Sequence, residues 1–366
     1  MVNKLNVYGV GHINDVIDFF IDENSIQATI VNTCEEFANA QSDFEIDFCD
    51  VKGQENIKRA LEIAAAGGHN AILIGPPGAG KTMLAKRLPT ILPPLTLQEA
   101  LETTKIHSVA GKPPENATII SKRPFRSPHH TISDVALVGG GGLPQPGEIS
   151  LAHNGVLFLD ELPEFKRTVL EVMRQPMEEM RVTISRAKIA MDFPSSFMLI
   201  ASMNPCPCGY YNHPQKECTC PPGAVQKYLN KISGPLLDRI DLHVEVTPVA
   251  FYELSSKQEF ERSETIRGRV IKARDRQAER YKDNPGIYSN AMMSSKMLKE
   301  ICVITQAGSN LLKVAMERLN LSARAYDRIL KVSRTIADLA GSDDIKPEHL
   351  AEAIQYRSLD REGWAG

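Results

Sequence analysis

Residues 75–82 have the composition and spacing of a phosphate-binding loop, Gly75-Pro76-Pro77-Gly78-Ala79-Gly80-Lys81-Thr82. Glycines allow backbone angles that are closed to other residues, so successive N–H groups can point at a phosphate. An apolar run at 71–74 precedes the loop and helical spacing at 83–88 follows it, which is the context this motif requires. We therefore predict a nucleoside-triphosphate site, with Lys81 on the β- and γ-phosphates and Thr82 on Mg²⁺. An ordinary glycine-rich turn is the alternative.

Two carboxylates follow a second apolar run, at 156–159. A fully apolar run is typical of a central parallel strand that is covered on both faces. Ligands of open α/β sheets bind at the carboxyl ends of such strands. We expect Asp160 to hold Mg²⁺ through its water shell and Glu161 to polarise the attacking water. A strand that merely ends in two acids is the alternative, and the preceding phosphate-binding loop disfavours it.

A third buried strand is predicted at 197–202, and Asn204 at its tip is placed to orient the attacking water. Four cysteines within fifteen residues follow, and together they can present four thiolates to one tetrahedral Zn²⁺. These are Cys206, Cys208, Cys218 and Cys220. C-x-C pairs are less usual than C-x-x-C pairs, so reduced thiols and a redox-labile loop stay open as alternatives. We interpret His213 as a loop residue, although it could replace a thiolate.

Length and composition exclude several classes of protein. A chain of 366 residues allows two domains with a sizeable core. The net charge of -3 gives no whole-chain attraction to nucleic acid, so any basic surface must be local. No run has the length of a membrane-spanning helix, and residues 1–5 do not resemble a signal peptide. Seven cysteines without regular spacing do not resemble a secreted disulfide framework, and we expect a cytoplasmic protein.

The sequence pattern divides the chain into three parts. Residues 1–46 are interpreted as an N-terminal remnant or linker, 47–250 as an α/β core with a parallel sheet, and 251–366 as a helical lid. Besides the strands above, the pattern predicts helices at 16–21, 55–66, 97–107, 165–180 with an interruption at Pro176, 255–283, 294–307, 310–319 and 323–339, and strands at 28–31 and 243–246. Ser322 is expected to cap the helix at 323–339, and Pro347 to begin a last one.

Two segments of the core have features of contact surfaces. Residues 108–147 are rich in Pro, Gly, Ser and His, and so long a loop inside a compact domain is usually functional or disordered. Alternation over 181–191 predicts a hairpin whose Arg181, Arg186 and Lys188 are available to solvent. From the pattern alone, a solvated edge hairpin protected by charges is favoured over a basic finger directed at a polyanion.

Taken together, these stretches resemble the AAA+ ATPases of the magnesium-chelatase-like group, and most closely the ComM family. The resemblance covers residues 47–360 almost continuously. It is carried by residues 51–54, 75–82, 123–130, 139–142, 146–155, 158–161, 204–208, 234–239 and 321–324. Members of the family normally carry a Lon-protease-like domain before the core, where this sequence has only residues 1–46. Activities that need that domain are therefore not carried over.

The resemblance implies roles for four residues in an αβα core with a helical lid. Glu161 would be the catalytic carboxylate and Asn204 the sensor-1 residue. Arg239 would be the arginine finger that reaches a neighbouring subunit's γ-phosphate, an effect that can be worth roughly 10³-fold in rate. Arg324 would be sensor 2. Without the resemblance, Arg239 would be a salt-bridge partner of its neighbours Asp238 or Asp241, and Arg324 an ordinary surface arginine.

The resemblance also implies partners. It suggests an ATP-dependent ring, usually a hexamer, with residues 123–150 as the helix-2 insert and 181–191 as the pre-sensor-1 hairpin. Both point into the central channel of related ring motors, which favours the polyanion interpretation of the hairpin. ComM relatives act in natural transformation as DNA-dependent motors that promote branch migration. We therefore expect a Mg²⁺-dependent ATPase that acts on DNA. The alternatives are a chelatase-type or chaperone-like ATPase that remodels a protein partner, and an ATP-binding scaffold without turnover.

Overall fold

The computed structural model describes residues 8–22, 25–28, 37, 41, 44–112, 119–141, 144–185, 190–211, 213, 215–248 and 260–357. Its contacts group the chain into two compact units, 1–44 and 45–366. In the first unit, helix α1 (Ile13–Ile21) begins after His12, whose side chain accepts a hydrogen bond from the Asn14 N–H, and it buries none of its residues. Most of the strand expected at 28–31 lies outside the described residues.

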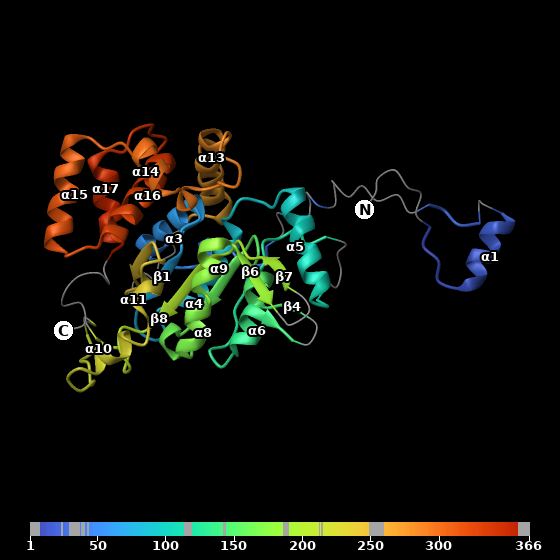
Figure 1. Cartoon of the computed structure of the whole chain (residues 1–366), viewed down its shortest axis with the longest axis horizontal. Coiled ribbons are helices and arrows are strands. Elements are labelled where there is room, and N and C mark those ends of the chain that lie inside the picture. Colours follow the sequence, from blue (N-terminus) through green and yellow to red (C-terminus); the bar gives the residue numbers. More distant parts are fainter. Residues whose placement is uncertain are drawn as a thin grey trace. The chain divides into compact units, whose positions relative to one another are not determined.

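A five-stranded parallel sheet forms the centre of the second unit (Figure 1). Its strand order is β2-β5-β8-β1-β9. The strands are β1 (Ala71–Ile74), β2 (Phe125–Arg126), β5 (Val156–Leu159), β8 (Met198–Met203) and β9 (Leu242–Glu245). The three apolar runs of the sequence therefore form the three central strands, as predicted, and every residue of those strands is buried.

Helices cover both faces of the sheet because alternate strand residues point to opposite sides. Ala71 and Leu73 of β1 belong to one apolar core, and Ile72 and Ile74 belong to the other. The first core contains α3 (Glu55–Gly67), α4 (Lys81–Arg87) and the helices that follow the sheet; the second contains α6 (Asp134–Val138), α7 (Glu148–Leu151), α8 (Arg167–Val172) and short helices near β9, α10 (Ala224–Leu229) and α11 (Gly234–Leu237). The predicted αβα class is confirmed.

The C-terminal region is helical, as predicted, and packs on the core (Figure 1). Its helices are α13 (Ser263–Tyr281), α14 (Ser295–Ile301), α15 (Gln306–Arg318), α16 (Ala323–Leu339) and α17 (Pro347–Gln355). Both α13 and α16 contact α3. The buried carboxylate of Asp338 in α16 accepts hydrogen bonds from Arg280 of α13 at 2.8 Å and from Asn290 at 2.9 Å. A charge can be buried there because it is paired and hydrogen-bonded.

Several helix boundaries differ from the prediction. The helix expected at 294–307 is wrong, because the chain leaves α14 at Cys302 and Thr305 caps a new helix by accepting from the Gly308 N–H. The interruption predicted in the helix at 165–180 is present but lies before Pro176, since α8 ends at Val172 and α9 (Arg174–Glu179) contains that proline. In a continuous helix, the ring of Pro176 would clash with the carbonyl of Val172, which lies four residues earlier.

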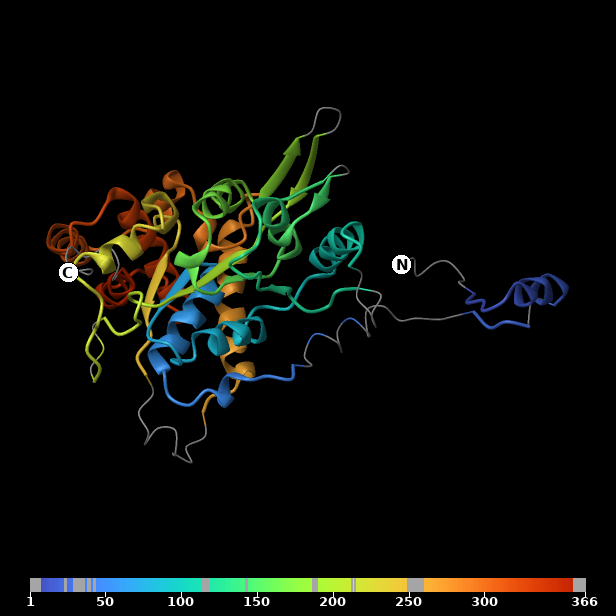
Figure 2. The ribbon, with the colours of Figure 1, turned by 90° about the horizontal axis from the view of Figure 1, so that it is seen from below.

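Two hairpins lie side by side on the second face of the sheet. One pairs β3 (Gly139–Gly140) with β4 (Gln145–Pro146), and the other pairs β6 (Arg181–Ser185) with β7 (Ala190–Pro194). A Cβ on Gly139 would lie 2.7 Å from the Ile184 side chain, so the hairpins pack closely. The β6–β7 hairpin projects from the body in Figure 2. It confirms the hairpin predicted at 181–191, but Arg186 and Lys188 lie outside the described residues.

The remaining long helix of the core, α5 (Leu97–Val109), follows the prediction of a helix at 97–107 closely. It begins with a capping box in which Thr96 accepts from the Glu99 N–H and Glu99 accepts from the Thr96 N–H. Helix α13 begins at Ser263, and residues 255–259 of the helix expected at 255–283 are outside the described part of the chain. Among the described helices, none has the length and apolar character needed to cross a membrane.

Two buried histidines should make the fold sensitive to acid. Burial is the largest cause that lowers the pKa of His69 and of His243. The unfolded chain takes up protons at these histidines below about pH 6.5, while the folded chain keeps them neutral, so stability that is present above pH 6.5 is lost as the pH falls. We expect the free energy of unfolding to fall by about 1.4 kcal/mol per pH unit for each such histidine. Urea denaturation at pH 7.5, 6.5 and 5.5 measures this slope.

The matched variants are His243→Gln and His129→Gln. His129 is exposed, and its replacement serves as the comparison for the buried His243. His243→Gln should reduce the slope. A free energy of unfolding that stays constant between pH 7.5 and 5.5 would contradict the prediction.

Candidate nucleotide-binding site

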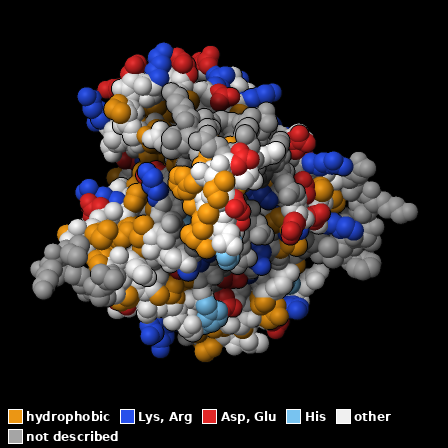
Figure 3. Space-filling model, turned by 90° about the vertical axis from the view of Figure 1, so that its right-hand side faces the viewer, with side chains coloured by type: hydrophobic (Ala, Val, Ile, Leu, Met, Phe, Trp, Pro, Cys, Tyr) orange, Lys and Arg blue, Asp and Glu red, His pale blue; other side chains and the backbone are white. Residues whose placement is uncertain are grey.

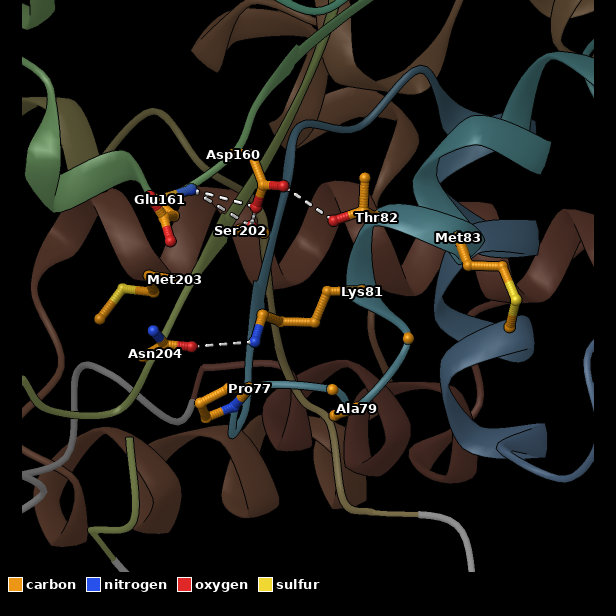
Figure 4. A pocket seen from close by; sticks show the side chains of 12 residues that line it. Pro77, Ala79, Lys81, Thr82, Met83, Asp160, Glu161, Ser202, Met203 and Asn204 are labelled. Carbon is orange, nitrogen blue, oxygen red and sulfur yellow. Dashed lines mark hydrogen bonds between the residues drawn. The ribbon is translucent and has the colours of Figure 1, made fainter. Parts of the chain in front are cut away.

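The loop between β1 and α4 has the backbone that the sequence motif predicts (Figure 4). Gly78 and Gly80 have φ angles of 77° and 83°, in the left-handed region that favours glycine. Gly75 lies against the end of the sheet, where a Cβ would collide with the carbonyl of Val246. Helix α4 begins at Lys81, directly after the loop. The loop is therefore held at the carboxyl edge of the sheet.

A cavity of ≈ 430 Å³ lies over this loop. It is lined by Pro77, Gly78, Ala79, Gly80, Lys81, Thr82, Met83, Asp160, Glu161, Ser202, Met203 and Asn204 (Figure 4). Most of the residues predicted for nucleotide and Mg²⁺ thus surround one space, although they come from three strand ends. Gly75 and Pro76 do not line the cavity, but both offer their carbonyls to Lys81.

The Lys81 ammonium group is folded back over its own loop. Its Nζ donates to the carbonyls of Gly75 at 2.6 Å and Pro76 at 2.9 Å, and to Oδ1 of Asn204 at 3.1 Å. Burial lowers the pKa of Lys81, and the negative charges of Asp160 and Glu161 oppose that effect. A phosphate that enters the cavity would compete with neutral carbonyl acceptors for a charged donor, and the charged partner forms the stronger hydrogen bond.

The Asp160 carboxylate is fixed by three donors. Thr82 Oγ1 donates to its Oδ2 at 2.8 Å, while the Ser202 hydroxyl and the Glu161 N–H, the latter at 3.1 Å, donate to Oδ1. Hydroxyl and carboxylate oxygens are hard ligands of the kind that Mg²⁺ prefers, usually with several waters retained. Thr82 and Asp160 would therefore hold a magnesium ion, which would supply positive charge beside a bound nucleotide.

Glu161 turns its side chain into the open part of the cavity. Its φ of 54° is unusual for a non-glycine residue, and strained backbone of this kind clusters at functional sites. The side chain is 56% exposed, and Oε2 lies 3.7 Å from Nδ1 of His130. His130 belongs to the segment between β2 and α6, so this segment reaches the cavity edge.

The sequence analysis missed three residues of this neighbourhood. Ser202 donates to Asp160, and its position as the one polar residue at the end of the apolar run at 197–202 could have indicated this contact. Gln54 donates from Nε2 to the Ala79 carbonyl of the loop at 2.8 Å. His130 contacts Glu161. Gln54 and His130 lie within stretches that carry the family resemblance, but no local spacing relates either of them to the loop.

The two arginines predicted for catalysis do not line the cavity over the loop. Arg239 donates to the Pro235 carbonyl and pairs with Glu178. It faces a different cavity of ≈ 900 Å³. Arg324 is 67% exposed and donates to Asp238 at 2.7 Å. The alternative in which Arg239 pairs with Asp238 or Asp241 is wrong, since Asp241 pairs with Arg328 and His69 instead.

The four clustered cysteines converge, as predicted from their spacing. All four Sγ atoms lie within 4.8 Å of one another, and all four residues are free thiols. Their loop lies against the phosphate-binding loop, because a Cβ on Gly209 would come within 2.5 Å of Pro77 Cδ. His213 does not join the cluster. Its Nδ1 accepts from the N–H groups of Gln215 and Lys216, as suits a loop residue.

A parallel sheet with a phosphate-binding loop after β1 and acidic residues after β5 defines an α/β protein of the AAA+-like class. The family models "Magnesium chelatase, subunit ChlI" and "Magnesium chelatase, subunit ChlI C-terminal" match residues 47–254 and 260–357. "Competence protein ComM" of Haemophilus influenzae is 44% identical over 362 residues, 99% of this chain and 70% of the relative. "Uncharacterized protein YifB" of Salmonella typhimurium is 44% identical over 368 residues, 99% of this chain and 69% of the relative.

A more distant relative is "Magnesium-chelatase subunit ChlI, chloroplastic" of Nicotiana tabacum, 26% identical over 221 residues, which are 60% of this chain and 45% of the relative. The chain belongs to the ComM-type family of magnesium-chelatase-like AAA+ proteins. This membership confirms the family predicted from the sequence motifs. It implies use of ATP and Mg²⁺.

The contact between Gly209 and Pro77 should affect nucleotide binding. Gly209→Ala places a methyl group against the loop, and overpacking of this kind costs about 1–3 kcal/mol. If about 1 kcal/mol of that cost displaces the loop, the affinity for a fluorescent ATP analogue falls about fivefold. Gly223→Ala is the matched control, because Gly223 has a similar φ of 76° but nothing within 4 Å of a Cβ. Equal affinities of the two variants in an equilibrium titration would rule out the expected effect.

Proposed function

We propose that this protein is a cytoplasmic, Mg²⁺-dependent ATPase that assembles into a ring and moves on DNA. The observation that carries the ATPase is the cavity in which Lys81, Thr82, Asp160, Glu161 and Asn204 meet. The relative from Haemophilus influenzae that bears the name competence protein supports a role with DNA.

In the proposed reaction, the loop N–H groups and Lys81 bind the β- and γ-phosphates. Lys81 exchanges its bonds to the Gly75 and Pro76 carbonyls for phosphate oxygens. Thr82 and Asp160 hold Mg²⁺, which neutralises charge on the phosphates when it is bound. Asn204 lies 3.1 Å from the lysine ammonium and so borders the position of the γ-phosphate. Glu161 extends into the open side of the cavity, where water can approach, and polarises that water for attack.

The proposed site is completed by a second subunit. Arg239 and Arg324 stand away from the cavity of their own chain, yet they lie close to each other because Arg324 bonds to Asp238, the residue before Arg239. One contact between neighbouring subunits can therefore present both arginines to a γ-phosphate bound by the next chain. Head-to-tail contacts of this kind close into rings. We propose Arg239 as the arginine finger and Arg324 as sensor 2, acting from this surface, in a hexamer.

DNA binding is proposed for the two hairpins, β3–β4 and β6–β7, which lie side by side and project together (Figure 2). Among their described residues the charges are balanced, since Arg181 is offset by Asp192 and also approaches Glu179 at the end of α9. Positive and negative side chains are likewise mixed on the face that Figure 3 shows. A phosphate backbone would therefore be held by a local contact at the hairpins and not by a broad basic field, and such binding weakens with salt in proportion to the number of phosphates contacted.

Mixing two inactive variants tests the composite site. Lys81→Ala removes phosphate binding in its own chain, whereas Arg239→Ala removes the finger supplied to the neighbour, so each alone should have almost no ATPase activity. In random 1:1 rings about a quarter of the contacts pair an intact Lys81 with an intact Arg239, which predicts recovery of about a quarter of the natural rate. The rate is measured after subunit exchange, with Glu178→Gln as control.

Glu178→Gln breaks the ion pair of Arg239 but keeps the arginine itself. Glu178→Gln alone should retain ATPase activity. Mixing it with Lys81→Ala should not raise the rate above that of the Glu178→Gln subunits present. A mixture of Lys81→Ala and Arg239→Ala that stays inactive after demonstrated subunit exchange would exclude Arg239 as a residue supplied to the neighbour.

Hydrolysis and DNA dependence are tested together with Glu161→Gln. The variant should bind ATP but turn it over at least about 10²-fold more slowly, because the water is no longer polarised. The natural sequence should hydrolyse ATP faster with single-stranded or branched DNA, in a salt-dependent manner. An unchanged rate in Glu161→Gln would show that another residue acts as base. No stimulation and no DNA binding at low salt would exclude the DNA-dependent motor.

A second candidate function is remodelling of a protein partner, as a magnesium-chelatase-type or chaperone-like ATPase. The family models and the relative from Nicotiana tabacum carry the chelatase name, and the proposed ATP cycle would be the same. Stimulation of ATPase activity by one stoichiometric protein partner, without stimulation by DNA, would favour this function. A protein that binds ATP without any turnover would instead be a scaffold, and the presence of Glu161 and Arg239 argues against it.

A further inference from the structure

The chain between β8 and α10 has no helix or strand among its described residues, 204–211, 213 and 215–223. Yet this connection brings four thiols together at Cys206, Cys208, Cys218 and Cys220. Long loops inside a compact domain carry a closure cost and have few apolar contacts of their own to offset it. A cross-link between the two ends of the loop would offset this closure cost.

The distances between the sulfur atoms are close to those expected around a single zinc ion. Cys206 Sγ lies 3.3 Å from Cys208 Sγ and 3.7 Å from Cys218 Sγ. The Sγ atoms of Cys208 and Cys218 are 3.6 Å apart. Four thiolates around one Zn²⁺ with Zn–S bonds of about 2.3 Å are separated by about 3.8 Å at the tetrahedral angle. A disulfide would bring two of them to about 2.05 Å, and none is present.

The surroundings of the sulfurs also suit a metal centre. The Tyr211 N–H donates to Cys206 Sγ at 3.3 Å, which is the kind of outer hydrogen bond that orients a thiolate ligand. Cys206 is buried and the other three are half-buried, so the group is enclosed but reachable by an ion. Four protein ligands leave no open position, which distinguishes a structural zinc site from a catalytic one.

The loop is attached to the nucleotide site at two points. Cys206 follows Asn204 by two residues, and Asn204 accepts from Lys81. Gly209, between the second and third cysteines, packs on Pro77 of the phosphate-binding loop. We propose that Cys206, Cys208, Cys218 and Cys220 bind one structural Zn²⁺, and that this ion fixes the loop that supports Pro77 and Asn204. Loss of the ion should loosen both supports and weaken nucleotide binding.

Metal analysis of the purified full chain tests the zinc site directly. We expect about one Zn²⁺ per chain, which Cys208→Ser loses and Cys49→Ser keeps, because Cys49 lies outside the cluster. Replacement by Co²⁺ should give the absorption bands of a tetrahedral cobalt–thiolate complex. A chain without stoichiometric metal, whose four thiols are free or form disulfides by mass spectrometry, would overturn the proposal.

A second measurement keeps the test valid if Cys208→Ser does not fold. Stepwise reaction of the natural chain with a mercurial reagent, in the presence of a chromogenic zinc indicator, should release about one zinc as four thiols react. Reaction of those thiols without zinc release would contradict the site. Neither measurement uses ATP, so their outcome is independent of the proposed ATPase.

The link to the nucleotide site rests on the proposed function and has its own readout. The affinity for a fluorescent ATP analogue should fall at least about fivefold after zinc is removed by a chelator, and should return when Zn²⁺ is added back. Secondary structure followed by circular dichroism should persist, because the sheet and its helices do not include the cysteine loop. Unchanged affinity after complete zinc removal would leave a metal site without the proposed support of Pro77 and Asn204, and would overturn that part.

Discussion

The register of the three central strands is the constraint on which the nucleotide site depends. Leu159 pairs with Ala201, and Met203 pairs with Ile74. The next residues, Asp160, Asn204 and the loop that starts at Gly75, consequently leave the sheet at one edge, and Ser202 lies just inside that edge in β8. A slip of one residue would move a side chain by about 3.3 Å and turn it to the other face. The geometry of the candidate site is thus a property of backbone pairing, and the apolar residues that fix the pairing are as necessary as the polar ones.

The same apolar burial creates the conditions for the polar edge. Both faces of the sheet are covered, so the buried polar groups at the strand ends have little water to compensate them and must satisfy one another, whereas Glu161 is 56% exposed. Ser202 is fully buried and bonds to Asp160, and Lys81 finds carbonyl and amide oxygens within its own surroundings. The bonds from Thr82 and Ser202 hold the Asp160 carboxylate in one orientation at the strand end. Preorganisation of this kind removes part of the entropic cost of binding.

The parts of the site that could be predicted are those encoded by local sequence. The glycine pattern of residues 75–82 and the acids after an apolar run predict position and role because a strand end and a tight loop are short-range structures. The partner of Arg239 could not be predicted, because Glu178 lies far from it in the sequence and only packing brings them together. The break before Gln306 was missed because a cap by Thr305 outweighs weak helical periodicity. The expectations of ring assembly and of action on DNA came only from the resemblance to the ComM family.

Nucleotide binding and the cysteine loop meet at a single strand tip. Lys81 divides its hydrogen bonds between its own loop and Asn204, so a phosphate that recruits the lysine must also change the bonding of the asparagine. Asn204 begins the segment that continues into Cys206 and Cys208, and the same segment returns to Pro77 through Gly209. The loop of residues 75–82 is thereby supported at both Pro77 and Lys81 by one connection. A rearrangement at the γ-phosphate therefore has a short covalent path to the surface beyond β8, where α10 and α11 lead to Arg239 and the proposed contact with the next subunit.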